Sequence, residues 1–411
     1  MLDIKFIRDN LEKAQEGCRR KKAEVDLERL LELDGERREL MGKIEALKAE
    51  RNKCSTLNVE HLREKAKEIK KEIKELEPRL DAVKKEFDKL MRQVPNLPFD
   101  DVIEGASDKD NKVLREEGEK RKFDFKPKDY LEIAEKLDIV DVARAAKVSG
   151  TRFGYLKGEA VLMEFALIQL ALEVLGKEGF IPVIPPVLLK DAPMRGMGYL
   201  DRGADEVYHL EKDDLYLTGT SEQPIGAMHS GEIFEEKDLP KRYVGFSTCF
   251  RREAGAYGKD TKGILRVHQF DKVEMFSFCH PDKSKDEHNL IFSLEEKLMK
   301  MLEIPYRVID ICSGDLGDPA AKKWDIEAWM PGQGEYRETH SASNCTDWQA
   351  RRLNIRYRGK EGTEFVHTLN GTAFAMGRIL IAIIENYQKK DGGIVVPEVL
   401  RKFMGGVKKI G

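Results

Sequence analysis

The 411-residue sequence predicts an α+β protein, in which an antiparallel β-sheet core flanked by helices follows an N-terminal antiparallel two-helix coiled-coil arm. Three observations predict this fold class. Apolar residues up to about position 95 recur at heptad spacing, short apolar runs after about position 125 alternate with Gly and Pro, and long helical patterns at 158–177 and 372–389 flank those runs. We place the domain boundary where the period changes, between residues 1–105 and 106–411.

Two apolar seams predict the arm. In the second seam the spacing alternates between 4 and 3 at Leu62, Ala66, Ile69, Ile73, Leu76, Leu80, Val83, Phe87, Leu90 and Val94. The first seam is less regular and contains Leu30, Leu33, Leu40, Ile44 and Leu47, with Arg37 and Arg51 at a positions. The polar segment "NKCSTLNVEH" between them predicts a turn, so the seams should pack as an antiparallel hairpin. Pro78 removes a helical hydrogen bond and should bend the second helix at a cost of about 3 kcal/mol.

The charge distribution leaves the role of the arm open. The net charge of the chain is −3, which excludes a generally basic nucleic-acid binder. Residues 1–100 carry 25 basic and 23 acidic side chains, and the distal part, 43–74, carries 10 and 6. This mild positive bias fits a solvated face of an interaction or oligomerisation module as well as a phosphate-binding face.

Cysteine usage and hydropathy predict a soluble, cytoplasmic protein without a membrane partner. The six cysteines contain no CxxC pair and suit neither a zinc site nor a disulfide framework, so we expect reduced thiols. The N-terminus "MLDIKFIRDN" lacks the apolar core of a signal peptide. Arg378 interrupts the longest apolar run, "TAFAMGRILIAII".

The segment "FRREAGAYGKDTKGILRVHQFDKVEMFSF", 250–278, predicts two strands with an unusually charged face. A loop with Gly255, Gly258 and Gly263 separates the strands. Period 2 places two charged residues on one face of the first strand and five residues on one face of the second, namely Arg251 and Glu253, then Arg266, His268, Phe270, Lys272 and Glu274. An aromatic ring among arginines and carboxylates suits a nucleotide site, whereas the alternative is a solvent-exposed charged sheet face.

The sequence "CFRREAGAYGKDTKGILRVHQFDKVE" resembles motif 2 of the class II aminoacyl-tRNA synthetases, and in detail that of the seryl-tRNA synthetases. "GFIPVIPPVLL" resembles motif 1, with Pro186 at the dimer interface, and "NGTAFAMGRILIAIIENYQ" resembles motif 3, with Arg378 as its arginine. Between them, "YRETHSASNCTDWQARRLNIRYR" is similar to another segment of that family. The resemblance covers essentially the whole chain and identifies the arm as an RNA-binding arm.

Two short segments depart from the family pattern. "TSEQ" replaces the usual TAE but keeps Thr220 and Glu222, and "ETHSAS" replaces EISSCS, so that His340 stands where serine is common. The second change affects fine contacts to ATP. The main motifs are all present, which argues against a catalytically inactive relative.

The resemblance implies a serine–tRNA ligase that forms seryl-adenylate from L-serine and ATP, and then charges tRNA(Ser) and, where a cell has it, tRNA(Sec). The implied catalytic residues are Arg251, Glu338 and Arg378. The implied ATP-binding residues are Arg251, Arg252, Glu253, Val267, Phe270, Glu338, Thr339, His340, Ser341 and Arg378. The implied serine-binding residues are Thr220, Ser221, Glu222, Arg251, Glu274, Asn344 and Thr372. The arm residues proposed to contact tRNA, near the far end of the hairpin, are Lys43, Lys48, Arg51 and Lys53.

The resemblance also implies a homodimer, and Mg²⁺ held with ATP by Glu338. No structural zinc is expected, unlike in the zinc-dependent serine enzymes of some methanogens. A buried Glu274 left without its hydroxyl donor would reject alanine, whereas a methyl group distinguishes threonine by only about 1–3 kcal/mol and requires a shaped wall. The sequence does not show that wall.

Two other functions compete with this interpretation. One is a synthetase-like ligase that charges a carrier protein, but such relatives lack the long arm. The other is a nucleotide-binding scaffold with a coiled coil for protein partners. A scaffold has no need of the set Arg251, Glu253, Glu274, Glu338 and Arg378.

Overall fold

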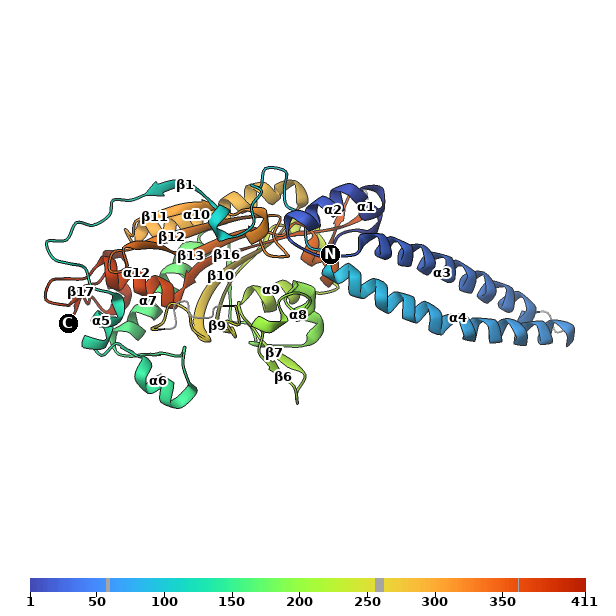
Figure 1. The fold of residues 1–411 in the computed structure, drawn as a ribbon, viewed down its shortest axis with the longest axis horizontal. Coiled ribbons are helices and arrows are strands. Elements are labelled where there is room, and N and C mark those ends of the chain that lie inside the picture. Colours follow the sequence, from blue (N-terminus) through green and yellow to red (C-terminus); the bar gives the residue numbers. More distant parts are fainter. Residues whose placement is uncertain (57–59, 256–261, 361) are drawn as a thin grey trace. The chain divides into compact units, whose positions relative to one another are not determined.

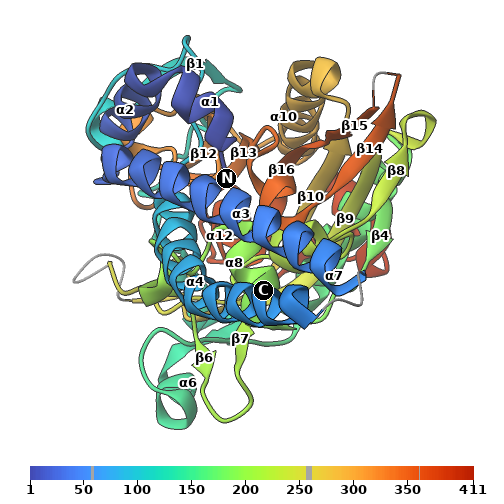
Figure 2. The ribbon, with the colours of Figure 1, turned by 90° about the vertical axis from the view of Figure 1, so that its right-hand side faces the viewer.

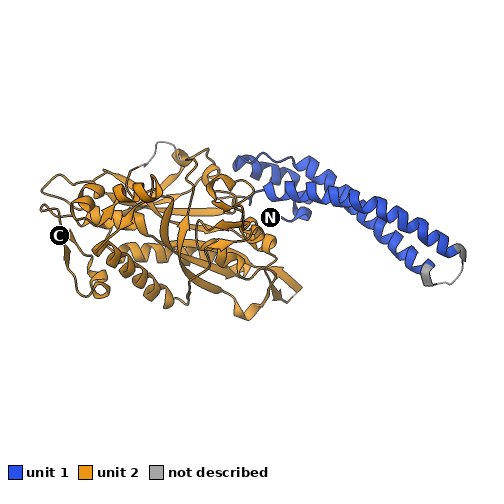
Figure 3. Ribbon diagram, turned by 90° about the horizontal axis from the view of Figure 1, so that it is seen from below, with its two compact units in different colours: residues 1–97 blue, residues 98–411 orange. Residues whose placement is uncertain are grey.

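The computed structural model describes residues 1–56, 60–255, 262–360 and 362–411, which form two compact units, 1–97 and 98–411 (Figure 3). The division therefore falls before residue 105, the boundary expected from the sequence. Residues just after the division pack with the second unit, because Val102 shares a small apolar cluster with Ile309 and Ile311.

Unit 1 consists of two short and two long helices, and its long helices lie side by side (Figure 1). They are α1 (Ile4–Asp9), α2 (Leu11–Arg20), α3 (Leu27–Thr56) and α4 (Glu60–Gln93). The two predicted seams meet in one apolar core, which confirms the coiled-coil arm. The turn expected at 52–61 is shorter, since α3 continues to Thr56 and α4 begins at Glu60; residues 57–59 lie outside the described chain.

A ladder of ion pairs sets the register between α3 and α4. The pairs Arg29–Glu86, Glu36–Arg79, Lys43–Glu72 and Glu50–Lys65 measure 3.0, 2.7, 3.0 and 2.7 Å. Each pair lies seven residues from the next on both helices and in opposite directions, which is the pattern of an antiparallel heptad repeat. The ribbons of α3 and α4 run side by side (Figure 2).

The irregular positions in the seams have local explanations. Arg37, at an a position, places its guanidinium 4.2 Å from the centre of the Phe87 ring and donates to the buried Asp34 at 2.8 Å. The positive charge of Arg37 is therefore balanced by Asp34, although the residue lies in the apolar seam. Helix α4 runs unbroken through Pro78.

Unit 2 is built on an eight-stranded sheet in the order β1-β11-β12-β13-β16-β10-β9-β4. Its strands are β1 (Lys112–Glu117), β4 (Ile181–Val183), β9 (Lys241–Phe250), β10 (Gln269–Cys279), β11 (Tyr306–Asp310), β12 (Lys322–Met330), β13 (Glu335–Asn344) and β16 (His367–Ala375). Within it all neighbouring strands are antiparallel except β4 and β9, which confirms the predicted fold class.

Three helices cover one face of this sheet: α7 (Glu159–Gly176), α10 (Ser284–Met301) and α12 (Met376–Asn386) (Figure 1). Helix α7 agrees with the predicted helix at 158–177. The helix predicted at 372–389 corresponds to α12, which is shorter at both ends: residues up to Ala375 pair with β10 as part of β16, and the helix ends at Asn386. The prediction was therefore wrong for residues 372–375 and 387–389.

The remaining elements are short. The helices are α5 (Tyr130–Lys136), α6 (Val142–Ser149), α8 (Asp191–Met197), α9 (Glu222–Ala227), α11 (Trp348–Leu353) and α13 (Glu398–Arg401). The strands of four small sheets are β2 (Val140–Asp141), β3 (Tyr155–Leu156), β5 (Leu188–Leu189), β6 (His209–Leu210), β7 (Leu215–Leu217), β8 (Ile233–Glu235), β14 (Arg356–Gly359), β15 (Gly362–Phe365), β17 (Ile394–Val395) and β18 (Lys409–Ile410).

The two charged strands are shorter than the sequence predicts. Strand β9 ends at Phe250 and β10 begins at Gln269, so the charged residues expected at their ends lie in the connecting segment, namely Arg251, Glu253, Arg266 and His268. Glu253 has φ +52°, which strand backbone does not adopt. Phe270, Lys272 and Glu274 do alternate along β10. Gly258, predicted in the loop, lies outside the described residues.

The six cysteines are buried and free of disulfides. No helix in the described part of the chain is both long enough and apolar enough to span a membrane.

Candidate active site

A cavity of about 640 Å³ opens on the sheet face opposite α7, α10 and α12. Its wall combines β10, β13 and β16 with the segment after β9, the start of α12 and the loop that follows α8. Eleven of the residues that the resemblance assigned to ATP or serine line it: Thr220, Glu222, Arg251, Glu253, Val267, Phe270, Glu338, Thr339, Ser341, Thr372 and Arg378.

Strand alternation explains why two assigned residues do not line the cavity. On β13, Thr339, Ser341 and Ser343 face the cavity. His340 lies among buried groups on the helix-covered side, with its ring centroid 5.9 Å from that of Phe374. Burial lowers the pKa of His340 to about 3, so its imidazole is neutral.

Asn344 lies on the same helix-covered side, where it contacts α10. Its side-chain amide donates to the hydroxyl of Ser284 at 2.8 Å. The residue is fully buried and is absent from the cavity lining, so the structure does not bring it to the other serine-binding candidates.

Three further assigned residues lie next to the cavity without lining it. Ser221 donates its hydroxyl to the carbonyl of Gly245 at 3.2 Å. The backbone N–H of Arg252 donates to the carbonyl of Glu206 at 2.9 Å, and its side chain is exposed. Glu274 is fully buried, below groups that do line the cavity.

One part of the cavity is aromatic and cationic. The guanidinium of Arg251 lies 5.3 Å from the centre of the Phe270 ring, and its Nε donates to the carbonyl of Gly219 at 3.1 Å. Arg266 donates to the carboxylate of Glu253 at 3.0 Å. Fixed guanidinium groups beside an aromatic ring can bind phosphates while the ring stacks on a base.

Arg378 and Glu338 face each other in this same part, 3.0 Å apart. The surroundings of Glu338 oppose its ionisation by desolvation, but the charges of Arg378, Lys323 and Arg251 keep its pKa below the usual value. Its side chain remains 47% exposed, which leaves an ionised carboxylate open to a ligand.

The other part of the cavity has a carboxylate floor. Glu274 accepts from the amide of Asn370 at 3.1 Å and lies 2.6 Å from the ammonium of Lys272. Lys272 also donates to the hydroxyl of Thr220 at 3.3 Å. This network holds the floor rigid beneath a small polar pocket.

Glu222 is a second buried carboxyl group at this end. Burial and the nearby charge of Glu274 raise its pKa to about 7, against the opposing effects of Lys272 and of hydrogen bonds from Gln349 and Tyr199. The amide of Gln349 donates to it at 3.3 Å. A carboxyl group whose pKa lies near 7 is partly ionised at neutral pH and can bind an ammonium group.

Sequence reasoning missed three residues of this pocket, Lys272, Asn370 and Tyr199. Alternation already placed Lys272 between Phe270 and Glu274 on the cavity face, so its role could have been found. Asn370 is the first residue of the motif that contains Thr372, so its position in the motif was a signal as well. Tyr199 carried no signal, because it lies in an irregular segment after a short helix.

The fold and this cavity define a class II aminoacyl-tRNA synthetase. Residues 206–387 match the family described as tRNA synthetase class II core domain (G, H, P, S and T). The fold is also similar to that of Giardia lamblia prolyl-tRNA synthetase in complex with prolyl-adenylate, with a TM-score of 0.58 and 18% identity over 66% of this chain and 54% of that chain.

More similar proteins identify the family within this class. Residues 1–98 match the seryl-tRNA synthetase N-terminal domain. Serine–tRNA ligase of Thermobifida fusca (strain YX) is 47% identical over 414 residues, 98% of each chain. The crystal structure of seryl-tRNA synthetase from Pyrococcus horikoshii complexed with ATP superposes with a TM-score of 0.92 and 44% identity, over 100% of this chain and 99% of that one. The chain belongs to the seryl-tRNA synthetase family, the ATP-dependent serine–tRNA ligases.

Proposed function

We propose that this cavity binds ATP and L-serine, forms seryl-adenylate and pyrophosphate, and then transfers the seryl group to the terminal ribose of tRNA(Ser). The observation that carries the proposal is the division of one cavity into a cationic, aromatic part around Arg251 and a buried carboxylate part around Glu274. The first part suits a nucleoside triphosphate, and the second suits a small amino acid with a hydroxyl group. The related Pyrococcus enzyme was solved with ATP, which supports the first assignment.

In the activation step, a carboxylate oxygen of serine bonds to the α-phosphorus of ATP while the bond to the bridging oxygen breaks and pyrophosphate leaves. Arg251 grips the α-phosphate and stabilises the charge that grows in the transition state. Phe270 stacks on one face of the adenine, and Glu253 with the backbone of Val267 receives its amino edge. Arg378 covers the other face and reaches the γ-phosphate. Catalysis is therefore positioning and charge stabilisation, without a protein nucleophile.

In the amino-acid pocket, Thr220 and Glu222 hold the amino group, and Glu274 and Thr372 read the hydroxyl. An analogue without the hydroxyl would leave Glu274 without that donor, and this rejects alanine. In the transfer step, a ribose hydroxyl of tRNA attacks the carbonyl carbon of the adenylate and AMP leaves. We assign no ligand contact to Ser221, Arg252, His340 or Asn344, because none of them lines the cavity. Glu274 does not line it either, but it contacts Lys272 and Asn370, which do, and therefore lies directly beneath the amino-acid pocket.

The cavity also fits a magnesium ion that arrives with ATP. Glu338 offers an ionised carboxylate, and the hydroxyls of Thr339 and Ser341 lie in the same wall, so the donors are the hard oxygens that Mg²⁺ prefers. Among the described residues, no group of three or more His, Cys, Asp or Glu is placed to hold a metal ion. When bound, Mg²⁺ would offset charge on the leaving pyrophosphate.

For tRNA, we propose that the arm binds a backbone feature of tRNA(Ser), and of tRNA(Sec) in cells that have it. In the arm, Lys43 and Lys48 pair with Glu72 and Glu77 at 3.0 and 2.9 Å. Phosphate contact by either lysine would therefore have to compete with a partner within the hairpin. Arg51 and Lys53 are proposed for contact by their position alone, since they lie nearer the far end of α3.

We further propose that the enzyme is a homodimer through the segment around Pro186. Pro186 is exposed, and beside it Ile184 and Ile181 are 83% and 56% exposed. Phe165, on α7 next to β4, is 54% exposed. Several large apolar side chains exposed on neighbouring elements are typical of a protein–protein interface. Analytical ultracentrifugation should find a dimer in the native chain and a monomer in Ile184→Asp.

We place the enzyme in the cytoplasm. Its six buried cysteines carry no disulfide, which suits a reducing compartment.

The test of the proposed function is serine-dependent exchange of pyrophosphate into ATP, followed by charging of a serine tRNA. We expect exchange with serine, weak exchange with threonine and none above background with alanine. Exchange without any charging of tRNA would favour a ligase for another acceptor. Absence of exchange with serine would contradict the proposal.

A further inference from the structure

Tyr199 occupies the amino-acid end of the cavity, although it belongs to none of the sequence motifs. It lines the cavity, and its phenol lies close enough to the carboxylate of Glu222 to favour the ionised form of that group. Burial and the nearby charge of Glu222 raise the pKa of Tyr199 well above 10, so the hydroxyl stays protonated and donates. Glu274 and Cys345 also lie close enough to affect it. Tyr199 therefore lines the cavity near the two carboxylates assigned to the amino acid.

The backbone on which Tyr199 lies is held against α11. Helix α8 ends at Gly198, which has φ +97°, and the N–H of Tyr199 donates to the carbonyl of Met194 at 3.3 Å. A Cβ at position 198 would lie 2.6 Å from the ring of Trp348, so a larger residue would push this turn away from α11. The direction in which the Tyr199 side chain leaves the turn is thus determined by packing.

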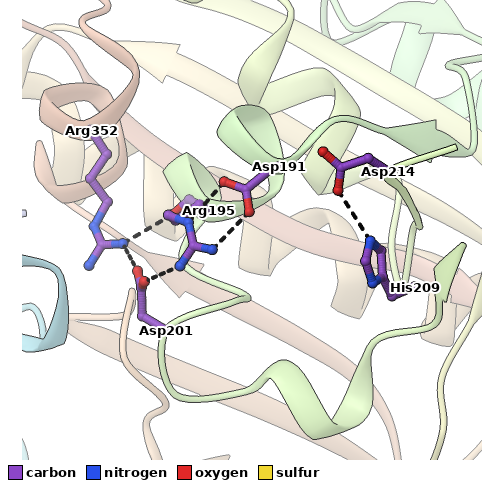
Figure 4. A network of polar contacts seen from close by, with 6 residues as sticks. All are labelled: Asp191, Arg195, Asp201, His209, Asp214 and Arg352. Carbon is purple, nitrogen blue, oxygen red and sulfur yellow. Dashed lines mark hydrogen bonds and ion pairs between the residues drawn. The ribbon is translucent and has the colours of Figure 1, made fainter. Parts of the chain in front are cut away.

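A charged network holds the chain two residues further on (Figure 4). Asp201 accepts from Arg195 of α8 at 2.8 Å and from Arg352 of α11 at 2.8 Å. Arg195 also binds both carboxylate oxygens of Asp191, and Arg352 lies 3.7 Å from the centre of the Trp348 ring. The side chains of Asp201 and Arg352 are only 8% and 4% exposed. Loss of Asp201 would leave two arginines without the carboxylate that joins α8 to α11.

We propose that Tyr199 is a further serine-binding residue, whose hydroxyl orients Glu222 and whose ring closes the pocket against the methyl group of threonine, and that Asp201 is its positioning residue. This inference rests on the proposed binding of serine in this cavity. The carboxylates Glu222 and Glu274 would bind the polar groups of serine, but a carboxylate does not exclude a methyl group by its shape. Tyr199 lines the cavity near both carboxylates, so its ring is the rigid group that could supply such a wall.

The experiment compares pyrophosphate exchange with serine and with threonine in Tyr199→Phe, Tyr199→Ala and Asp201→Asn. Tyr199→Phe keeps the ring and loses the hydroxyl; we expect the KM for serine to rise about 10-fold or more, with the KM for ATP nearly unchanged. Tyr199→Ala removes the wall, and we expect the preference for serine over threonine to fall about 10-fold or more. Asp201→Asn should produce smaller changes in the same directions.

A pH series separates direct contact from a purely structural role. Serine binding requires ionised Glu222, so the KM for serine should fall as the pH rises through its pKa of about 7. The donated hydrogen bond favours ionisation, so Tyr199→Phe should move this fall to higher pH. The matched control is Tyr216→Phe on β7, because Tyr216 stacks on His209 at 4.3 Å and does not line the cavity.

The outcomes are distinct. If Tyr199→Ala keeps the native preference for serine over threonine, the ring does not exclude the methyl group of threonine. If Tyr199→Phe and Tyr216→Phe have the same KM for serine at each pH, the hydroxyl of Tyr199 does not contact Glu222. If Asp201→Asn lowers the melting temperature but leaves the KM for serine unchanged, Asp201 is not a positioning residue. If Tyr199→Ala does not fold, Tyr199→Phe and its pH series still decide the contact. Failure of the native enzyme to use serine contradicts the proposed function instead.

Discussion

The arm and the cavity use the same charged residue types for opposite purposes. In the arm, Lys43 and Glu72 pair at 3.0 Å with side chains that are 53% and 45% exposed. In the cavity, Lys272 and Glu274 pair at 2.6 Å with side chains that are 9% and 0% exposed. Exposed pairs contribute about 0–1 kcal/mol and set register, whereas buried pairs are costly to break. Burial therefore separates the energetic roles of these two pairs: the exposed pair adds little stability, whereas the buried pair would be costly to break.

Arg251→Ala tests the cavity side of this comparison most severely. The variant should lower kcat for pyrophosphate exchange by about 10²–10³-fold, because the lost guanidinium stabilises charge in the transition state. Its circular dichroism spectrum should match that of the native chain. Arg358→Ala, at an exposed arginine on β14, serves as the control. Native exchange rates in Arg251→Ala would remove this residue from the mechanism.

Deletion of residues 30–93, closed with a short Gly/Ser linker, tests the arm side. The arm has its own apolar core, so exchange should remain close to native while charging of a serine tRNA falls about 100-fold or more, equivalent to about 2.7 kcal/mol. The family resemblance points to the long variable arm as the feature read, so a tRNA with that arm shortened is the matched substrate. Equal charging of both tRNAs by the full chain, or undiminished charging by the deletion, would refute the role of the arm. Binding should also weaken with salt.

Glu274→Ala distinguishes the two parts of the cavity. It leaves Lys272 and Asn370 without their shared carboxylate and removes the group that reads the serine hydroxyl. We expect the KM for serine to rise about 10–100-fold, with the KM for ATP changing much less. Loss of ATP affinity with serine affinity preserved would show that the pocket is assigned incorrectly.

Glu295→Gln tests what a buried charge costs. Glu295 of α10 is fully buried beneath Gly371, and among the residues that the structure describes neither of its carboxyl oxygens has a hydrogen-bond partner of normal geometry. Burial and the charge of Glu274 raise its pKa well above 4.5. The folded state binds this proton more tightly, so the free energy of unfolding falls as the pH rises above 4.5. Gln removes that loss. Thermal melts should show a gain of about 1–3 kcal/mol at pH 8 and a smaller gain at pH 5.

The smallest effect is expected from Glu72→Gln in the arm. It breaks the exposed pair with Lys43, and the stability of the protein should change by less than about 1 kcal/mol. The change should shrink further in high salt. A loss as large as the effect at Glu295 would show that exposure does not separate the two kinds of charge.

The sequence by itself determined whatever depends on local period. Heptad spacing from Leu62 to Val94 requires a partner helix, and period 2 along β10 places Phe270, Lys272 and Glu274 on one face. The matched motifs gave the family, and with it eleven of the residues that line the cavity. The coiled coil and the shared face of β10 could be predicted because 3.6-residue and 2-residue repeats follow from backbone geometry alone.

Only the tertiary structure decided which face of each strand is covered. His340 and Ser341 are neighbours in one motif, yet one lies beneath the helices and the other lines the cavity. Arg251 reaches the cavity from beyond the end of β9, because the strand stops where the backbone leaves the sheet. Tyr199 enters through a turn whose direction depends on Trp348, far along the chain. Such placements arise from packing between distant segments, which no local period records.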